Sequence, residues 1–191
     1  MGKPLILHQI HILTSFDEDV YLVTHTAEQA FQYEKKIDFP REVTFITDDP
    51  KYHEETRLNR PILGIYSGFK RLKEEGFLKA FLISCDMPLI KPEVIRLMIQ
   101  ESKGYDCCIP RWENGFLEPF FAIYPVEKGL HRARKLLTEG RGLTGLIDES
   151  WETNYVSVED SIKPLDQNLV SLINISGPID LVKATKLYKE G

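Results

Sequence analysis

Hydrophobic and polar residues alternate along the chain in short blocks, and the spacing within each block separates expected strands from expected helices. Compact apolar runs rich in β-branched and aromatic residues predict strands; in chain order these are 20–24, 42–47, 80–85, 106–110, 119–125, 154–158 and 169–175. Apolar residues at three- and four-residue spacing predict helices; in chain order these are 3–15, 26–36, 61–75, 92–103, 126–138, 142–149 and 178–190. The polar segment 51–60 is expected to form a loop on the ligand side.

Strand and helix alternate through the first hundred residues. This order predicts right-handed βαβ units and an α/β fold with a mostly parallel central sheet. The sequence contains no internal repeat, low-complexity tract or linker, so we expect a single domain covering residues 1–191. A chain of 191 residues with 42% hydrophobic and 28% charged residues has the composition of a globular protein with a substantial core.

The segment 79–90, KAFLISCDMPLI, contains an apolar run that stops abruptly at Asp86. A short run without polar alternation predicts a strand buried on both faces. Because Pro88 has no amide hydrogen for a sheet, the strand should end near Asp86. Ligands bind outside the carboxyl ends of strands in open α/β sheets. Asp86 is therefore a candidate metal ligand, and a cap of the following turn or helix is the alternative.

Other candidate residues also lie at the expected ends of strands and helices. Glu118 precedes Pro119, and Asn174 ends an expected strand. The alternatives are an ordinary loop carboxylate for Glu118 and a turn former for Asn174. Two further features are the Asp48-Asp49 pair, whose alternative is a strand-ending turn, and the glycines Gly64 and Gly68, which allow close approach to one helix face.

The histidines do not indicate a metal site, and the common nucleotide-binding motifs are absent from the sequence. His8 and His11 are three residues apart on an expected helix, but they lack a third metal ligand nearby. His25, His53 and His131 are isolated in the sequence. Neither a P-loop nor a G-x-G-x-x-G motif occurs, and no serine lies in a G-x-S-x-G motif.

Charge and cysteine content limit the environment and the partners. A net charge of −5 argues against a general nucleic-acid surface, although a site with a bound cation can accept an anionic substrate. No apolar run approaches the roughly 20 residues of a membrane-spanning helix, and the start lacks the apolar core of a secretory signal, so we expect a cytoplasmic protein. The three cysteines, Cys85, Cys107 and Cys108, lie in apolar runs and are expected to be buried, reduced thiols.

Several segments, in this order, resemble the molybdenum cofactor guanylyltransferases. The segments are GKPLILH (2–8), RPILGIYSGF (60–69), ISCDMPLI (83–90), GFLEPFFAIY (115–124) and INISGPIDL (173–181). They are similar to the family's G-K-P-L-x-x-H, G-P-L-A-G-I/L, C-D-M-P, E-P-L-x-A-L-Y and N-x-N-T-P-E-D-L patterns. The resemblance covers essentially the whole chain, and it implies a Rossmann-like three-layer fold of the nucleotide-diphospho-sugar transferase type.

The resemblance also implies a reaction and roles for residues. Members of the family transfer GMP from GTP to the terminal phosphate of molybdopterin and release pyrophosphate. The resemblance implies that Asp86 is the catalytic residue, which binds Mg²⁺ and nucleotide. It implies further nucleotide contacts at Asp48 or Asp49, Pro61 and Gly64. It implies pterin-side contacts at Glu118, Pro119 and Asn174. GTP and molybdopterin are the expected substrates, and molybdoenzymes or other cofactor-biosynthesis proteins are candidate partners. Mg²⁺ suits such chemistry, because phosphoryl-type transfer depends on positioning and charge neutralisation.

One departure from the family concerns the start of the chain. The family's first strand and its glycine-rich loop, L-A-G-G-x-S-x-R-M-G-x-x-K, would precede the segment that begins at Gly2. The phosphate-binding amides of that loop would then be missing, and the neighbouring strands would have unpaired edges. Three explanations would account for the missing loop: a gene start assigned too late, a truncation, or an inactive relative that serves as a binding module. We favour the first, because Asp86 and the E-P segment are intact. A relative that uses CTP is the alternative enzyme.

Overall fold

The computed structural model describes residues 3–16, 19–40, 43–52, 60–139 and 143–190. The chain divides into two compact units. The first consists of Met1–Glu18, Phe81–Ile123 and Glu152–Gly191, and the second of Asp19–Ala80 and Tyr124–Trp151. The single domain expected over residues 1–191 stays a prediction.

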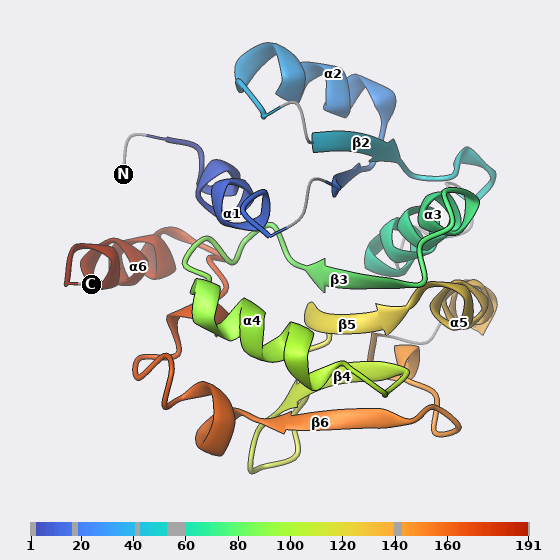
Figure 1. Cartoon of the computed structure of the whole chain (residues 1–191). Helices are drawn as coiled ribbons and strands as arrows, with labels where there is room; N and C mark the ends of the chain where they lie inside the picture. The colour runs from blue at the N-terminus through green and yellow to red at the C-terminus, as the bar shows by residue number, and fades with distance from the viewer. Residues whose placement is uncertain (1–2, 17–18, 41–42, 53–59, 140–142, 191) are drawn as a thin grey trace. The chain divides into compact units, whose positions relative to one another are not determined.

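Helices and strands alternate through most of the chain (Figure 1). The α-helices are α1 (Leu5–Leu13), α2 (Ala27–Lys36), α3 (Arg60–Glu74), α4 (Pro92–Glu101), α5 (Val126–Glu139) and α6 (Pro178–Glu190). The strands are β1 (Val20–Thr24), β2 (Val43–Thr47), β3 (Lys79–Ile83), β4 (Cys107–Arg111), β5 (Phe121–Pro125) and β6 (Thr153–Ser157). Short 3₁₀ turns lie at Pro50–Tyr52, Leu143–Leu146 and Val170–Leu172, and a π-helical turn lies at Val158–Ile162.

The strands of the described residues form one parallel sheet and one mixed sheet. Strands β1 and β2 are parallel, with Val20 opposite Val43 and Thr24 opposite Thr47. The second sheet has the order β3-β5-β4-β6. In it, β4 and β6 are parallel, whereas β4 and β5 are antiparallel around the Cys108–Ile123 pair. The α/β class is therefore confirmed.

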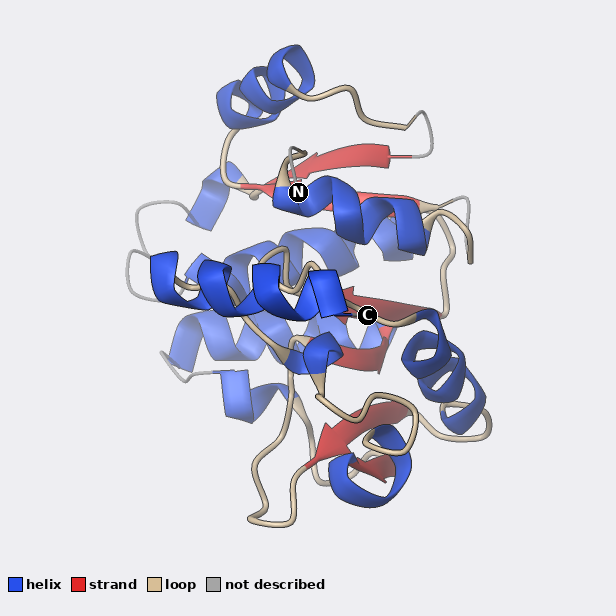
Figure 2. Cartoon of the chain, turned by 90° about the vertical axis from the view of Figure 1, so that its left-hand side faces the viewer, coloured by secondary structure: helices blue, strands red, loops and turns tan. Residues whose placement is uncertain are grey.

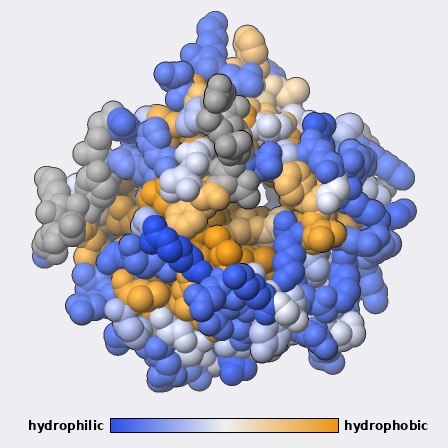
Figure 3. Space-filling view, viewed as in Figure 1, coloured by the Kyte–Doolittle hydropathy of each residue, from blue (hydrophilic) through white to orange (hydrophobic). Residues whose placement is uncertain are grey.

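In the second unit, α3 packs against α5, and α2 lies beside β1 and β2 (Figure 1). Gly129 of α5 faces the ring of Phe69, which makes an edge-on contact with Tyr124. Thr26 caps the start of α2, because its side chain accepts a hydrogen bond from the Gln29 amide at 3.1 Å. Hydrophilic residues dominate the surface around α2, at the top of Figure 3.

In the first unit, α4 packs on β4 and β6. The core joins α4, strands β4, β5 and β6, the turns that follow β3 and β6, and the 3₁₀ turn at Val170–Leu172. Its buried residues are Met87, Ile90, Val94, Ile95, Met98, Cys108, Phe121, Ile123, Val156, Val158, Ile162 and Leu172. Helices α1 and α6 lie on the same side of this unit in both ribbon views (Figures 1 and 2). This core fixes the turn that carries Asp86, because Met87 is 1% exposed.

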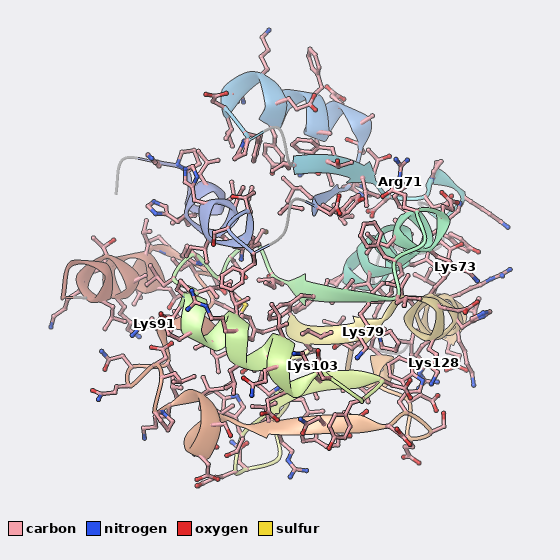
Figure 4. All side chains as sticks on the ribbon, viewed as in Figure 1. Arg71, Lys73, Lys79, Lys91, Lys103 and Lys128 are labelled. Carbon is pink, nitrogen blue, oxygen red and sulfur yellow. The ribbon has the colours of Figure 1, made fainter. Side chains whose placement is uncertain are left out.

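The prediction of a strand over residues 169–175 is wrong. Leu169 has a left-handed backbone with φ 49°, and Val170–Leu172 form a 3₁₀ turn. The buried Asp166 accepts a hydrogen bond from the Ser171 amide at 2.8 Å, and the Lys91 amide donates to Ser171 Oγ at 2.9 Å. Lys91, labelled in Figure 4, precedes α4, and its Nζ lies 3.4 Å from Asp166 Oδ1. These polar contacts fold the segment against α4, and neighbouring apolar residues in the sequence do not reveal them.

Three further expectations are corrected. The helix expected over 142–149 is reduced, within the described residues, to the 3₁₀ turn Leu143–Leu146. Strand β3 is half-buried and not buried on both faces, because it is the edge strand of its sheet. It ends at Ile83, so Cys85 lies in the following turn and is exposed, whereas Cys107 and Cys108 are buried. His53 and most of the expected loop 51–60 lie outside the described residues.

Among the described residues, no helix combines the length and the apolar character that crossing a membrane requires.

Candidate active site

Asp86 lies in a tight turn directly after β3. The Met87 amide donates to the Ser84 carbonyl at 3.3 Å, which closes the turn around Cys85 and Asp86. Asp86 itself is half-buried. Its Oδ1 atom is buried, and no group in the described part of the chain donates a hydrogen bond to it. A buried carboxylate oxygen without a donor is costly to desolvate, and a bound cation would remove this cost.

Backbone hydrogen bonds bring two other predicted segments to this turn. The Ile175 amide donates to the Asp86 carbonyl at 2.8 Å, so the neighbouring Asn174, which is exposed, lies beside the turn. The Ser84 amide donates to the Phe120 carbonyl at 3.0 Å, which places the Glu118-Pro119 segment next to the end of β3. The structure therefore gathers the segments that carry Asp86, Glu118 and Asn174 within the first unit, and their metal-side and pterin-side roles stay predictions.

Glu118 is a half-buried carboxylate with one strong donor. Its Oε1 atom accepts a hydrogen bond from the Trp112 indole at 2.7 Å. Burial raises the pKa of the Glu118 carboxyl, and the hydrogen bond from Trp112 partly opposes this shift. The Glu118 amide donates to the Pro110 carbonyl at 3.1 Å, which fixes the segment against the end of β4. Glu118 is thus an oriented acid at the same end of the sheet as Asp86.

A second group of candidates lies in the second unit, after β1 and β2. Asp48 directly follows β2 and is 6% exposed. Its Oδ2 atom lies 2.9 Å from Nδ1 of His25, which directly follows β1. Gly64 of α3 lies beside them, because a Cβ added there would be 3.6 Å from Val23 Cγ1 and 3.7 Å from Asp48 Oδ1, both ordinary contacts. Pro61, in the first turn of α3, is exposed.

Asp49 has a different environment from Asp48. Lys70 Nζ donates to Asp49 Oδ2 at 2.9 Å, and the Asp49 amide donates to Ser67 Oγ at 2.9 Å. The hydrogen bond from Lys70 lowers the pKa of Asp49, which therefore stays ionised. Asp49 is tied to α3, whereas Asp48 points towards His25 and Gly64.

A pocket of about 330 Å³ lies between β2 and α3. Its lining residues are Phe45, Ile46, Thr47, Asp48, Asp49, Pro50, Ser67, Lys70, Arg71 and Glu74. Arg71, labelled in Figure 4, extends from α3 and pairs with Glu75. Basic and acidic side chains are both present in this lining, and two of them, Lys70 and Asp49, pair with each other.

Sequence reasoning missed two residues next to the predicted ones. His25, expected to be isolated, pairs with Asp48 because β1 and β2 are parallel neighbours that end side by side. Gln9 of α1 is 3% exposed and donates hydrogen bonds to the turn that carries Asp86. The one signal for Gln9 was a polar residue among the apolar positions of the expected helix 3–15.

The described residues contain no group of three or more histidine, cysteine, aspartate or glutamate side chains placed to hold a metal ion. A single carboxylate is nevertheless compatible with Mg²⁺, which usually keeps several waters and binds one or two carboxylates together with substrate phosphates. Asp86 Oδ1 fits that use, because it is an oxygen ligand without a hydrogen-bond donor among the described residues.

Comparison with solved structures identifies the fold. The chain superimposes on molybdopterin-guanine dinucleotide biosynthesis protein A of Archaeoglobus fulgidus with a TM-score of 0.72 at 23% identity, covering 100% of this chain and 88% of the other. It also superimposes on 4-diphosphocytidyl-2C-methyl-D-erythritol synthase of Anaerococcus prevotii with a TM-score of 0.69 at 12% identity, covering 98% and 87%. The fold is therefore that of the nucleotide-diphospho-sugar transferases, as predicted.

Sequence comparison gives the family. The MobA-like NTP transferase domain matches residues 1–154, and the chain belongs to this family of nucleotidyltransferases. One relative is a "probable molybdenum cofactor guanylyltransferase" of Natranaerobius thermophilus, 32% identical over 189 residues, or 97% of this chain and 83% of the relative. A protein of the same name from Thermococcus sibiricus is 27% identical over 184 residues, covering 95% and 84%. The match to the relative of that name from Pelotomaculum thermopropionicum, at 36% identity, spans 65% of this chain and 58% of the relative.

Proposed function

We propose that this chain transfers GMP from GTP to the terminal phosphate of molybdopterin in a Mg²⁺-dependent reaction. The proposal is supported by the family of the chain and by the guanylyltransferase names of its relatives. The single observation that carries it is Asp86 Oδ1, a buried carboxylate oxygen without a hydrogen-bond donor among the described residues, at the carboxyl end of β3. Both substrates are expected in the cytoplasm.

In the proposed reaction, a phosphate oxygen of molybdopterin attacks the α-phosphorus of GTP. The new O–P bond forms as the bond between the α-phosphorus and its bridging oxygen breaks, and pyrophosphate leaves. The attacking phosphate is already ionised, so no strong general base is required. When bound, Mg²⁺ would neutralise charge on the phosphate oxygens.

The chain's own residues provide binding and orientation. Asp86 would hold the metal through Oδ1, and the hydrogen bonds at Ser84, Met87 and Ile175 fix its backbone. On the nucleotide side, Gly64 brings the backbone of α3 close to Asp48, whose carboxylate is oriented by His25. On the pterin side, Glu118 is held by the Trp112 indole and, with its raised pKa, gains a proton more readily than an exposed glutamate.

Calorimetric titration of GTP with Mg²⁺ into the 191-residue chain tests the proposal. The same titration should be made with a form extended by the codons upstream of Met1, and with CTP and ATP as competing nucleotides. We expect Asp86→Asn to weaken Mg²⁺-dependent GTP binding at least tenfold and to leave any binding in EDTA unchanged.

Asp106→Asn is a matched control. Asp106 precedes β4, at the other end of the sheet from Asp86, and its Oδ2 accepts from the Glu152 amide at 3.0 Å. This variant should bind GTP like the unsubstituted chain. The proposal is overturned if neither form of the chain binds GTP, or if Asp86→Asn binds as tightly as the control.

A further inference from the structure

Gln9 is a buried polar residue on a mostly apolar helix. It lies in the middle of α1 and is 3% exposed, next to the buried Ile10. Its Nε2 atom donates to the Ser84 carbonyl at 2.7 Å and to the Met87 carbonyl at 3.2 Å. Because both partners are carbonyl oxygens, the amide nitrogen must face them. Both hydrogen atoms of the side-chain amide are thus used on one turn.

The two carbonyls lie on either side of Asp86. The turn is also closed by the Met87 amide, and the Ile175 amide fixes the Asp86 carbonyl between them. Three separate parts of the first unit therefore hold four consecutive residues: α1 through Gln9, the turn itself, and the segment before α6. Gln9 is the contributor whose side chain can be replaced without changing the backbone groups of the turn.

We propose that Gln9 is a positioning residue, which fixes the turn so that Asp86 presents Oδ1 to a divalent cation. This inference rests on the proposed role of Asp86 as the metal ligand. Without the amide, the Ser84 and Met87 carbonyls lose a buried donor, and the turn gains freedom around Asp86. Groups that orient a metal ligand commonly change metal affinity by about 10- to 100-fold when they are replaced.

Gln9→Met is the informative variant, because methionine is close to glutamine in length and volume but has no N–H donor. Ser171→Ala is the matched control. Ser171 is 0% exposed, lies in the same unit, and accepts from the Lys91 amide at 2.9 Å. Both variants remove buried hydrogen bonds, and the control leaves the turn untouched.

Two measurements separate positioning from general stability. Mn²⁺ binding in the presence of GTP, followed by water-proton relaxation, should weaken about tenfold or more in Gln9→Met and stay unchanged in Ser171→Ala. Hydrogen exchange at the Met87 and Ile175 amides should accelerate at least tenfold in Gln9→Met, with no matching acceleration in the core of α4, and stay unchanged in the control.

The outcomes distinguish this inference from the proposed function. If Asp86→Asn loses Mn²⁺ while Gln9→Met binds it normally, the role of Gln9 is refuted and the role of Asp86 stands. If exchange at both amides is unchanged in Gln9→Met, the positioning role is refuted in the same way. If the unsubstituted chain binds no Mn²⁺ with GTP, both proposals fall.

Discussion

The packing of α3 against α5 gives a quantitative prediction for Gly129→Ala. A Cβ at Gly129 would lie 2.7 Å from Cε2 of Phe69, and 3.1 Å from two further ring carbons. The ring would have to retreat by about 0.7 Å to restore a contact of 3.4 Å, the lower limit of ordinary spacing. Phe69 is 3% exposed, and its ring already contacts Tyr124, so the space for this movement is small.

Overpacking of a core usually costs about 1–3 kcal/mol, and alanine recovers up to about 1 kcal/mol relative to glycine within a helix. We therefore expect a net loss of about 1–2 kcal/mol in the free energy of unfolding, measured by urea denaturation. Gly68→Ala is the control on α3, because its nearest contact, Val23 Cγ2, would lie at 3.4 Å and the helix gain should dominate. Gly129→Ala as stable as Gly68→Ala would refute this account of the packing.

Three other predictions concern titratable groups. Burial raises the pKa of Glu118 in the folded chain above its value in the unfolded chain. The free energy of unfolding is therefore highest while Glu118 is protonated, and it falls as pH rises through the folded pKa. Glu118→Gln should gain stability over the unsubstituted chain between pH about 4.3 and neutrality, and a gain that persists at pH 3 would contradict this. His25→Ala removes a hydrogen-bond partner of the buried Asp48 carboxylate and should cost about 1–3 kcal/mol in urea denaturation, with weaker GTP binding; unchanged stability would contradict it. Burial and contact with Glu75 raise the pKa of Tyr21 to about 12, so an absorbance titration should show a tyrosine step there that Tyr21→Phe removes, and persistence of the step would refute the assignment.

Local sequence patterns predicted elements that depend on neighbouring residues. The strand 20–24 was predicted with the bounds of β1, because its β-branched and aromatic residues are adjacent in the sequence. The prediction of a strand over 169–175 was wrong because the conformation of this segment depends on two polar contacts. One is with Asp166, just before the segment, and the other is with Lys91, which is 80 residues away from Ser171 in the sequence. Apolar content alone does not separate a strand from a buried 3₁₀ segment.

In the candidate site, too, local sequence signals were predicted, whereas contacts between distant residues were not. Asp86 was found because a strand end followed by proline is a local signal. The hydrogen bonds from Gln9 span 75 and 78 residues of sequence, and the pairing of His25 with Asp48 spans 23. Such contacts follow from the packing of α1 and the neighbouring order of β1 and β2, which no single segment specifies. The roles assigned to Asp86, Asp48, Asp49, Pro61, Gly64, Glu118, Pro119 and Asn174 stay predictions.

The most direct test of the central claim is nucleotidyl transfer itself. The unsubstituted chain and its upstream-extended form would be incubated with molybdopterin, Mg²⁺ and GTP, and the release of pyrophosphate and the dinucleotide product would be measured. The proposed function predicts pyrophosphate release that requires all three components, is weaker with CTP, and is abolished by Asp86→Asn but retained by Asp106→Asn. Absence of GTP-dependent transfer in both forms, or transfer that survives in Asp86→Asn, would contradict it.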